Sequence, residues 1–173
     1  MKKFKILPML LILPLALTAC GKAEEETAQN IKILTEPPAL TVSGGDESIT
    51  AMRGTYGWNY INDKNQSTGV QADSIHPLDA ENEIPSITLQ KSDDPEESGL
   101  VSLEWEEMPS EIDVTAWETK WGDPQHAESW GVLIDGNEFN LKEGDYVYEI
   151  KAAWGNKTEY NGTVYYSFYG ILE

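Results

Sequence analysis

The side chains that most often carry out chemistry are few in this chain of 173 residues. Its two histidines, His76 and His126, lie fifty positions apart and follow neither a His-x-His nor a His-Glu-x-x-His spacing. A zinc site would need both histidines and several carboxylates brought together by the fold alone, so two separate surface-loop histidines are the simpler interpretation. The motifs Gly-x-Ser-x-Gly and Gly-x-x-x-x-Gly-Lys are absent. These patterns do not support hydrolysis or phosphoryl transfer, and we expect no cofactor or bound metal.

Carboxylates are abundant, with 30 Asp+Glu against 12 Lys+Arg. A glycosidase-type acid pair could come from residues 73–97 or 104–111. Such a pair needs one acid whose pKa is raised inside a pocket, whereas these stretches are typical of exposed loops. We therefore expect no enzyme, with an acid-pair hydrolase as an open alternative. In residues 62–69, a lysine stands among the would-be calcium ligands, so a plain hairpin loop is the better interpretation.

Aromatic residues are the more informative group, with six Trp, eight Tyr and three Phe. Trp117, Trp121 and Trp130 surround a Gly-Asp-Pro turn, and exposed aromatic rings can bind sugars, peptides or proteins. The alternative is that these rings fill a core and support loops folded over a sheet. Arg53, the only arginine, is either a carboxylate clamp inside the domain or part of a site for an anionic ligand. The candidate ligand-binding residues are Arg53, Trp58, Trp121 and Trp130.

The segments that must position these residues alternate between apolar and polar side chains, with a period of two that is typical of β-strands. Residues 144–154 place Tyr146, Tyr148, Ile150, Ala152 and Trp154 on one face, as in a strand with one wet side. After a turn, residues 163–172 have the β-branched and aromatic content of a second strand, which predicts a C-terminal hairpin. No long amphipathic helix pattern occurs after the N-terminal region. Eight to ten short strands predict an all-β domain over residues 39–173, a β-sandwich rather than a small barrel. The other predicted strands are 39–43, 48–53, 55–60, 84–90, 100–106, 112–117, 130–134 and 138–141.

Two stretches sharpen this prediction. Leu103-Glu104-Trp105, followed by Met108-Pro109 and Ile112–Trp117, resembles the B strand, B–C loop and C strand of an immunoglobulin-like domain, with Trp117 as its core tryptophan. Residues 141–148 are similar to the E–F corner and F strand of the same folds. The resemblance covers about residues 99–173 and implies an immunoglobulin-like β-sandwich without the disulfide of antibody domains, since the chain has one cysteine.

The N-terminal region predicts export and a lipid anchor. Lys2, Lys3 and Lys5 precede an apolar run over residues 6–17 that is short and broken by two prolines, as in a signal peptide. The run ends in Leu17-Thr18-Ala19-Cys20-Gly21, which resembles the lipobox of bacterial lipoproteins and implies lipidation of Cys20. The less favoured alternative is a core cysteine after an ordinary secretory signal. We expect a signal peptide over residues 1–19 and a flexible acidic tether over residues 20–38 that includes the lipidated cysteine.

These observations bound the function. Without residues 1–19, the formal charge is −21, which argues against nucleic acid as a partner. With stretches such as Arg53-Gly54-Thr55-Tyr56-Gly57-Trp58 and Asp73-Ser74-Ile75-His76-Pro77-Leu78, the chain is also similar to exported proteins of Gram-positive bacteria, a resemblance that implies a compartment and no activity. We expect a lipoprotein on the outer face of the cytoplasmic membrane, with a β-sandwich that acts as a non-catalytic interaction module for a protein or cell-wall polymer. The alternative is a cell-wall or carbohydrate-binding module that uses exposed tryptophans.

Overall fold

The computed structural model describes residues 33–94, 98–155 and 158–173. The predicted signal peptide, Cys20 and most of the predicted tether lie outside these residues. The chain divides between Ile31 and Lys32, and the C-terminal unit spans Lys32–Glu173.

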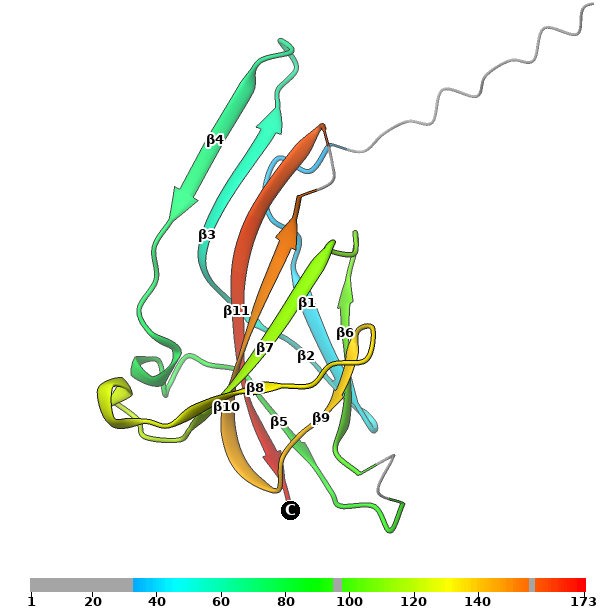
Figure 1. Cartoon of the computed structure of the whole chain (residues 1–173), viewed down its shortest axis with the longest axis vertical. Coiled ribbons are helices and arrows are strands. Elements are labelled where there is room, and N and C mark those ends of the chain that lie inside the picture. Colours follow the sequence, from blue (N-terminus) through cyan, green and yellow to red (C-terminus); the bar gives the residue numbers. More distant parts are fainter. Residues whose placement is uncertain (1–32, 95–97, 156–157) are drawn as a thin grey trace, which may run out of the picture. The chain divides into compact units, whose positions relative to one another are not determined.

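Two sheets form this unit, and their strands alternate between buried and exposed positions. The smaller sheet has four strands in the order β2-β1-β6-β9, all antiparallel. The larger sheet follows the order β4-β3-β11-β10-β7-β8, and Figure 1 shows β3, β11, β10 and β7 side by side. A further strand, β5, pairs in parallel with the C-terminal end of β11. The bounds are β1 Leu40–Gly44, β2 Glu47–Thr50, β3 Met52–Ile61, β4 Ser67–Ala72, β5 Ser86–Leu89, β6 Leu100–Trp105, β7 Glu111–Glu118, β8 Ser129–Val132, β9 Glu138–Asn140, β10 Gly144–Trp154 and β11 Tyr160–Leu172, with short 3-10 helices η1 Pro77–Asp79 and η2 Pro124–His126.

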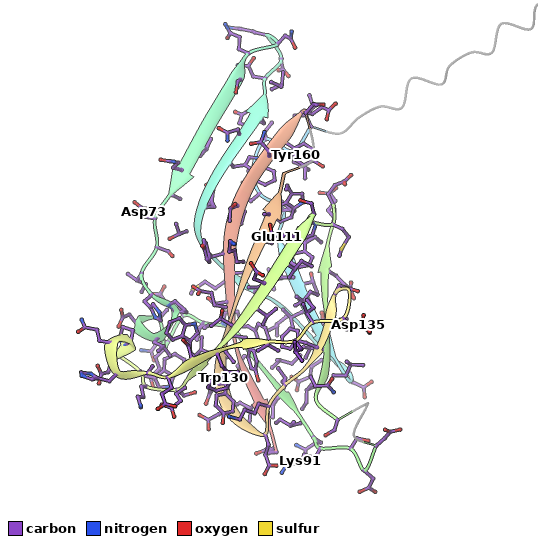
Figure 2. The ribbon with its side chains drawn as sticks, viewed as in Figure 1. Asp73, Lys91, Glu111, Trp130, Asp135 and Tyr160 are labelled. Atoms are coloured by element: carbon purple, nitrogen blue, oxygen red, sulfur yellow. The ribbon has the colours of Figure 1, made fainter. Side chains whose placement is uncertain are left out.

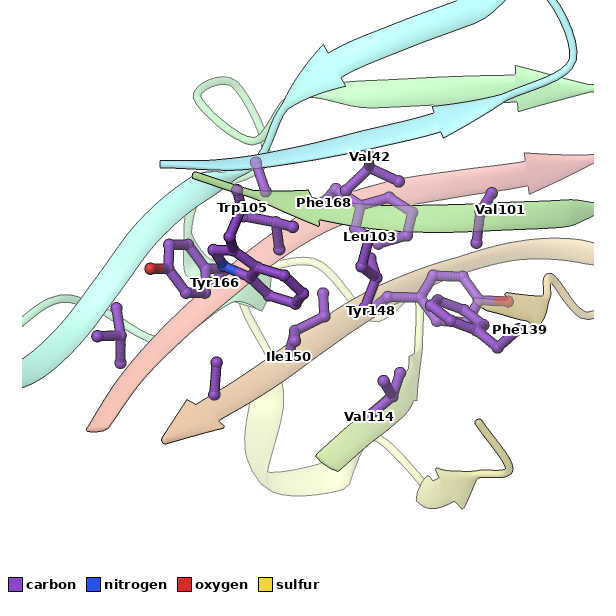
Figure 3. Packing of buried hydrophobic residues seen from close by; sticks show 14 of the residues in the cluster. Val42, Val101, Leu103, Trp105, Val114, Phe139, Tyr148, Ile150, Tyr166 and Phe168 are labelled. Carbon is purple, nitrogen blue, oxygen red and sulfur yellow. The ribbon is translucent and has the colours of Figure 1, made fainter. Parts of the chain in front are cut away.

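The two sheets pack face to face around one main hydrophobic core. Leu103 from the smaller sheet packs near Tyr148, Ile150 and Phe168 of the larger sheet, and all four side chains are fully buried (Figure 3). Trp58 lies edge to face against Trp154, with ring centroids 5.3 Å apart. Burial of this much apolar and aromatic surface is the main stabilising contribution in such a domain.

The prediction of an all-β sandwich is confirmed. Tyr148, Ile150, Ala152 and Trp154 point into the core, as the period of two in β10 predicted. The predicted B and C strands correspond to β6 and β7, which lie in opposite sheets. The Tyr148 hydroxyl accepts a hydrogen bond from the backbone N–H of Lys142 at 2.8 Å, and burial raises the pKa of Tyr148 to about 12. A tyrosine bonded to the backbone just upstream is a feature of immunoglobulin-like E–F corners.

Trp117 does not occupy the predicted core position. On β7 the inward residues are Val114 and Ala116, so Trp117 faces the opposite side of the sheet. There it packs against a second, smaller cluster of Leu78, Ile84 and Val147. The tryptophans of the main core are Trp58, Trp105 and Trp154.

The folded unit begins earlier than residue 39. Leu34, Pro37 and Pro38 are buried, and three side chains bond their backbone carbonyls. Trp58 Nε1 donates to Leu34 at 2.8 Å, Arg53 Nη1 donates to Pro37 at 2.6 Å, and the Tyr166 hydroxyl donates to Pro38 at 2.6 Å. Residues 34–38, predicted as part of the tether, therefore belong to the sandwich.

The sequence pattern also missed strand β4. Its six residues, Ser67–Ala72, include no large apolar side chain except Val70, and most of them are exposed. The hairpin loop predicted between β3 and β4 is present: Asn62 Oδ1 accepts the backbone N–H groups of Lys64 and Gln66. Asn65 in the same loop has a φ of 57°, a conformation that asparagine tolerates.

Candidate functional site

Arg53 acts inside the domain. Besides its hydrogen bond to Pro37, its guanidinium lies 3.8 Å from the Glu36 carboxylate and 5.7 Å from the centre of the Tyr56 ring. This is the carboxylate-clamp alternative, with the added function of fixing the N-terminal segment of the sandwich. A solvent-exposed ion pair of this kind contributes little by itself.

Trp58 is 1% exposed and stacks on Tyr160 at 5.6 Å between ring centroids. Its single polar atom is already bonded to the Leu34 carbonyl. The ring is therefore a core element and has no free face for a ligand.

The three tryptophans near the Gly-Asp-Pro turn do not form one aromatic platform. In the β7–β8 register Ala116 opposes Trp130 and Trp117 opposes Ser129, so Trp117 and Trp130 lie on opposite faces of the sheet. Trp130, labelled on β8 in Figure 2, packs against Tyr146 and the edge of the main core. Lys142 Nζ lies 4.2 Å from the Trp130 ring centre. Trp121 packs on the second cluster with Trp117, edge to face with Tyr169 at 5.4 Å.

The two histidines lie in different environments. His126 is exposed, and its Nδ1 lies 2.7 Å from Asp123 Oδ1. His76 is half-buried and begins η1, where its Nδ1 accepts the backbone N–H of Leu78 at 3.2 Å. In the described part of the chain, no group of three or more His, Cys, Asp or Glu side chains could hold a metal ion.

The strongest candidate site lies on the outer face of the larger sheet, the face turned away from the main core. Two adjoining pockets there share Glu149 and Tyr165. The first has a volume of about 340 Å³ and the second about 430 Å³. We call them together the outer groove. The first pocket is lined by Met52, Gly54, Thr55, Ser74, Ile75, His76, Pro77, Glu149, Tyr165, Tyr166 and Ser167, and the second by Ile112, Asp113, Val114, Thr115, Gly131, Val132, Ile134, Glu149, Lys151 and Tyr165.

Strand register sets the floor of the outer groove. Glu149 on β10 lies directly opposite Thr115 on β7 and Ser167 on β11. Lys151, two residues further along the same face, lies opposite Asp113 and Tyr165. Directly opposed side chains on one face of a sheet are about 4.5 to 5.5 Å apart at Cβ. The floor therefore presents polar groups in a fixed arrangement on a rigid surface.

A loop over residues 74–77 forms one wall of the first pocket and follows Asp73, which is labelled in Figure 2. Opposite it, the register of β11 and β3 shifts between Val164 and Tyr166, which leaves a bulge at the level of Gly54 and Thr55. Ser74 bonds Thr55 there, with its N–H 3.1 Å from the threonine Oγ1. A Cβ at position 54 would lie 3.2 Å from Ser74 Oγ and 3.3 Å from the Tyr165 carbonyl oxygen. Glycine at this position allows the loop to lie close to the sheet, and bulges often occur beside binding sites.

Electrostatically, the first pocket combines a carboxyl and an imidazole, both with shifted pKa values. Burial raises the pKa of Glu149, and the neighbouring Trp117 indole lowers it in part. The buried Trp117 Nε1 has no partner at hydrogen-bond geometry among the residues that the structure describes, so burial decides the direction of the Glu149 shift. Burial lowers the pKa of His76, against an opposing effect of Asp79. Both shifts favour the neutral forms of the two groups.

The acids that the sequence suggested as a catalytic pair lie elsewhere. Glu104, Glu106, Glu111, Asp73 and Asp79 are exposed. Glu149 was missed, although a signal was present: it is a carboxylate in the middle of β10, directly between the buried Tyr148 and Ile150. Only the fold shows that a loop 75 residues earlier covers this position.

Comparison of this chain with family models, curated proteins and solved structures finds no match. Within the described residues, no helix has the length and apolar character needed to cross a membrane.

Proposed function

We propose that this protein is a lipid-anchored extracytoplasmic lipoprotein and that its β-sandwich is a non-catalytic interaction module whose partner docks in the outer groove. The docking site is proposed from one observation: two adjoining pockets on the outer face of the larger sheet share Glu149 and Tyr165. Binding sites are typically concave, with apolar walls and a few fixed polar groups. The first pocket has this composition.

The anchor is proposed from the lipobox resemblance at residues 17–21 and from the position of the only cysteine within it. Two acyl chains on Cys20 would hold the protein on the membrane essentially permanently. The sandwich would then present the outer groove to proteins or cell-wall polymer outside the cell.

A carbohydrate or cell-wall polymer is the second candidate partner. Its support no longer comes from tryptophans, since Trp58 is buried and Trp117 and Trp130 face different sides. It comes from a shallow polar depression further along the larger sheet, where Asn59, Gln71 and Thr163 surround Gly57. Amide and hydroxyl groups over a glycine floor suit hydrogen bonding to a sugar polymer.

The test is capture from intact membranes with the full-length lipoprotein and two variants. Tyr165→Ala removes the ring that both pockets share, and Thr50→Ala on the smaller sheet serves as the matched control. We expect the same partner with the wild type and Thr50→Ala, and at least tenfold less with Tyr165→Ala. Equal capture by all three proteins would contradict docking in the outer groove. Loss with Thr50→Ala alone would place the partner on the smaller sheet.

A further inference from the structure

The first pocket of the outer groove contains a carboxyl but no Lys or Arg among its lining residues. The charged and titratable groups around Glu149 come from several elements, and each has another contact. Lys151 on β10 directs its ammonium to Asp113 on β7, with Nζ 3.2 Å from Oδ2. That pairing raises the pKa of Lys151. Arg53 on β3 is bonded to the N-terminal segment.

The remaining groups near Glu149 are neutral or aromatic. Directly opposite it lie Thr115 and Ser167, and Tyr165 lies further along the same face. His76 uses its Nδ1 to accept the Leu78 N–H, and burial lowers its pKa. Among the described residues, the group that lowers the pKa of Glu149 against the effect of burial is the Trp117 indole, which carries no charge. Within the described residues, no cation therefore offsets the ionised Glu149.

A half-buried carboxylate without a cation is destabilised relative to the same group in water. A ligand that brings a positive charge would remove this cost on binding. The pocket walls favour a cation on an apolar stem, because Met52, Ile75 and Pro77 supply apolar surface and Tyr165 supplies an aromatic ring. Methylene groups pack on such surfaces, and ammonium groups are attracted to aromatic faces.

We propose that the first pocket binds the ammonium group of a lysine-type side chain presented by a peptide partner, with the Glu149 carboxylate as its counter-ion. This inference rests on the proposed function, because it names the chemistry that the outer groove recognises. The large negative charge of the chain adds a long-range attraction for basic peptides.

The test uses the full-length lipoprotein in lipid nanodiscs and two small probes. Nα-acetyl-lysine N-methylamide carries the ammonium, and Nα-acetyl-norleucine N-methylamide has a similar stem without it. We expect calorimetric binding of the lysine probe with a Kd of about 1 mM, in line with the small size of the probe, and at least tenfold weaker binding of the norleucine probe.

Two variants and one pH series test whether binding of the lysine probe depends on Glu149. Glu149→Gln keeps the shape of the side chain and should weaken the lysine probe at least tenfold, whereas Glu104→Gln, which removes an exposed carboxylate on β6 of the smaller sheet, should change it less than threefold. Circular dichroism verifies that both variants are folded. In the wild type, binding should strengthen as the pH rises through the raised pKa of Glu149, a measurement that needs no variant.

Equal binding of the two probes, or lysine binding unchanged by Glu149→Gln, would overturn the proposal. If the lysine probe fails while Tyr165→Ala still abolishes capture of the membrane partner, the outer groove is a docking site for another chemistry. If both experiments fail, the proposed function fails as well.

Discussion

At the scale of single residues, Trp154 is among the largest fully buried side chains of the core. It is fully buried, contacts Trp58 and Trp105 edge to face, and donates its Nε1–H to the Glu107 carbonyl at 3.0 Å. Trp154→Ala should lower the free energy of unfolding by about 3 to 5 kcal/mol. Urea denaturation followed by tryptophan fluorescence measures this, and a loss below about 1 kcal/mol would show that the core can close over the gap.

Trp121 and Trp117 should behave alike, since both pack against the second cluster and both are partly exposed. Each change to alanine should cost about 1 to 2 kcal/mol, less than Trp154→Ala. The sequence alone predicts a different order, with a core role for Trp117 and no effect at Trp121. Thermal melts of the three variants decide between the two. A Trp117→Ala loss as large as that of Trp154→Ala would contradict the two-cluster description.

Glu149 should make stability depend on pH. Its pKa is higher in the folded protein than in the unfolded chain, so the folded state binds more protons between the two values. Stability from this group is fully present below the unfolded pKa and is lost as the pH rises through the folded pKa. Glu149→Gln should therefore raise Tm at pH 7.5 and leave it nearly unchanged at pH 4. Glu104→Gln, which removes an exposed carboxylate on β6, is the control and should not raise Tm at pH 7.5.

At the scale of elements, the N-terminal segment of residues 34–38 packs on the main core and accepts hydrogen bonds from side chains of β3 and β11. Removing it would leave the buried Trp58 Nε1–H and Tyr166 hydroxyl without their acceptors. Each lost acceptor costs about 1 to 3 kcal/mol. A chain that begins at Leu40 should therefore be clearly less stable than one that begins at Lys32, as chemical denaturation of the two would show. Equal midpoints would mean that the segment is a passive extension of the tether.

Strands with a clear alternation could be predicted from the sequence, and the elements that depend on distant contacts could not. In β10, every second residue is apolar, so both the strand and its buried face followed from the pattern. Strand β4 has mostly small polar residues and exists because β3 provides a pairing partner. The segment of residues 34–38 contains two prolines and no periodicity, and its burial depends on side chains at positions 53, 58 and 166.

The candidate site depends even more on contacts between residues far apart in the sequence, so less of it could be predicted. The position of Glu149 on the wet face of β10 followed from the period of two, because its neighbours Tyr148 and Ile150 point inward. The pocket around it did not, because its walls come from β3, β11 and the loop before η1, which are far apart in the sequence. The resemblance to an immunoglobulin-like C strand predicts Trp117 in the core. However, Trp117 is three residues from the inward-facing Val114, and residues an odd number apart on a strand point to opposite faces of the sheet.

At the scale of the whole molecule, the proposed anchor determines where the outer groove acts. If Cys20 carries the lipid, eleven residues, 21–31, lie between the anchor and the unit that begins at Lys32. A flexible segment of that length has a root-mean-square span of about 20 Å. The sandwich would then stay close to the membrane, and its partners would have to be surface proteins or polymer within that distance.

The proposed anchor itself is tested by Cys20→Ser. The thiol is the acceptor of the lipid, so the variant should either appear in the soluble extracytoplasmic fraction or remain as unprocessed precursor, and labelling of cells with a radioactive fatty acid should no longer mark the protein. Ala19→Gly, which keeps a small residue before the cysteine, is the matched control and should remain in the membrane fraction at mature size. A Cys20→Ser protein that still fractionates with membranes at mature size would contradict lipidation.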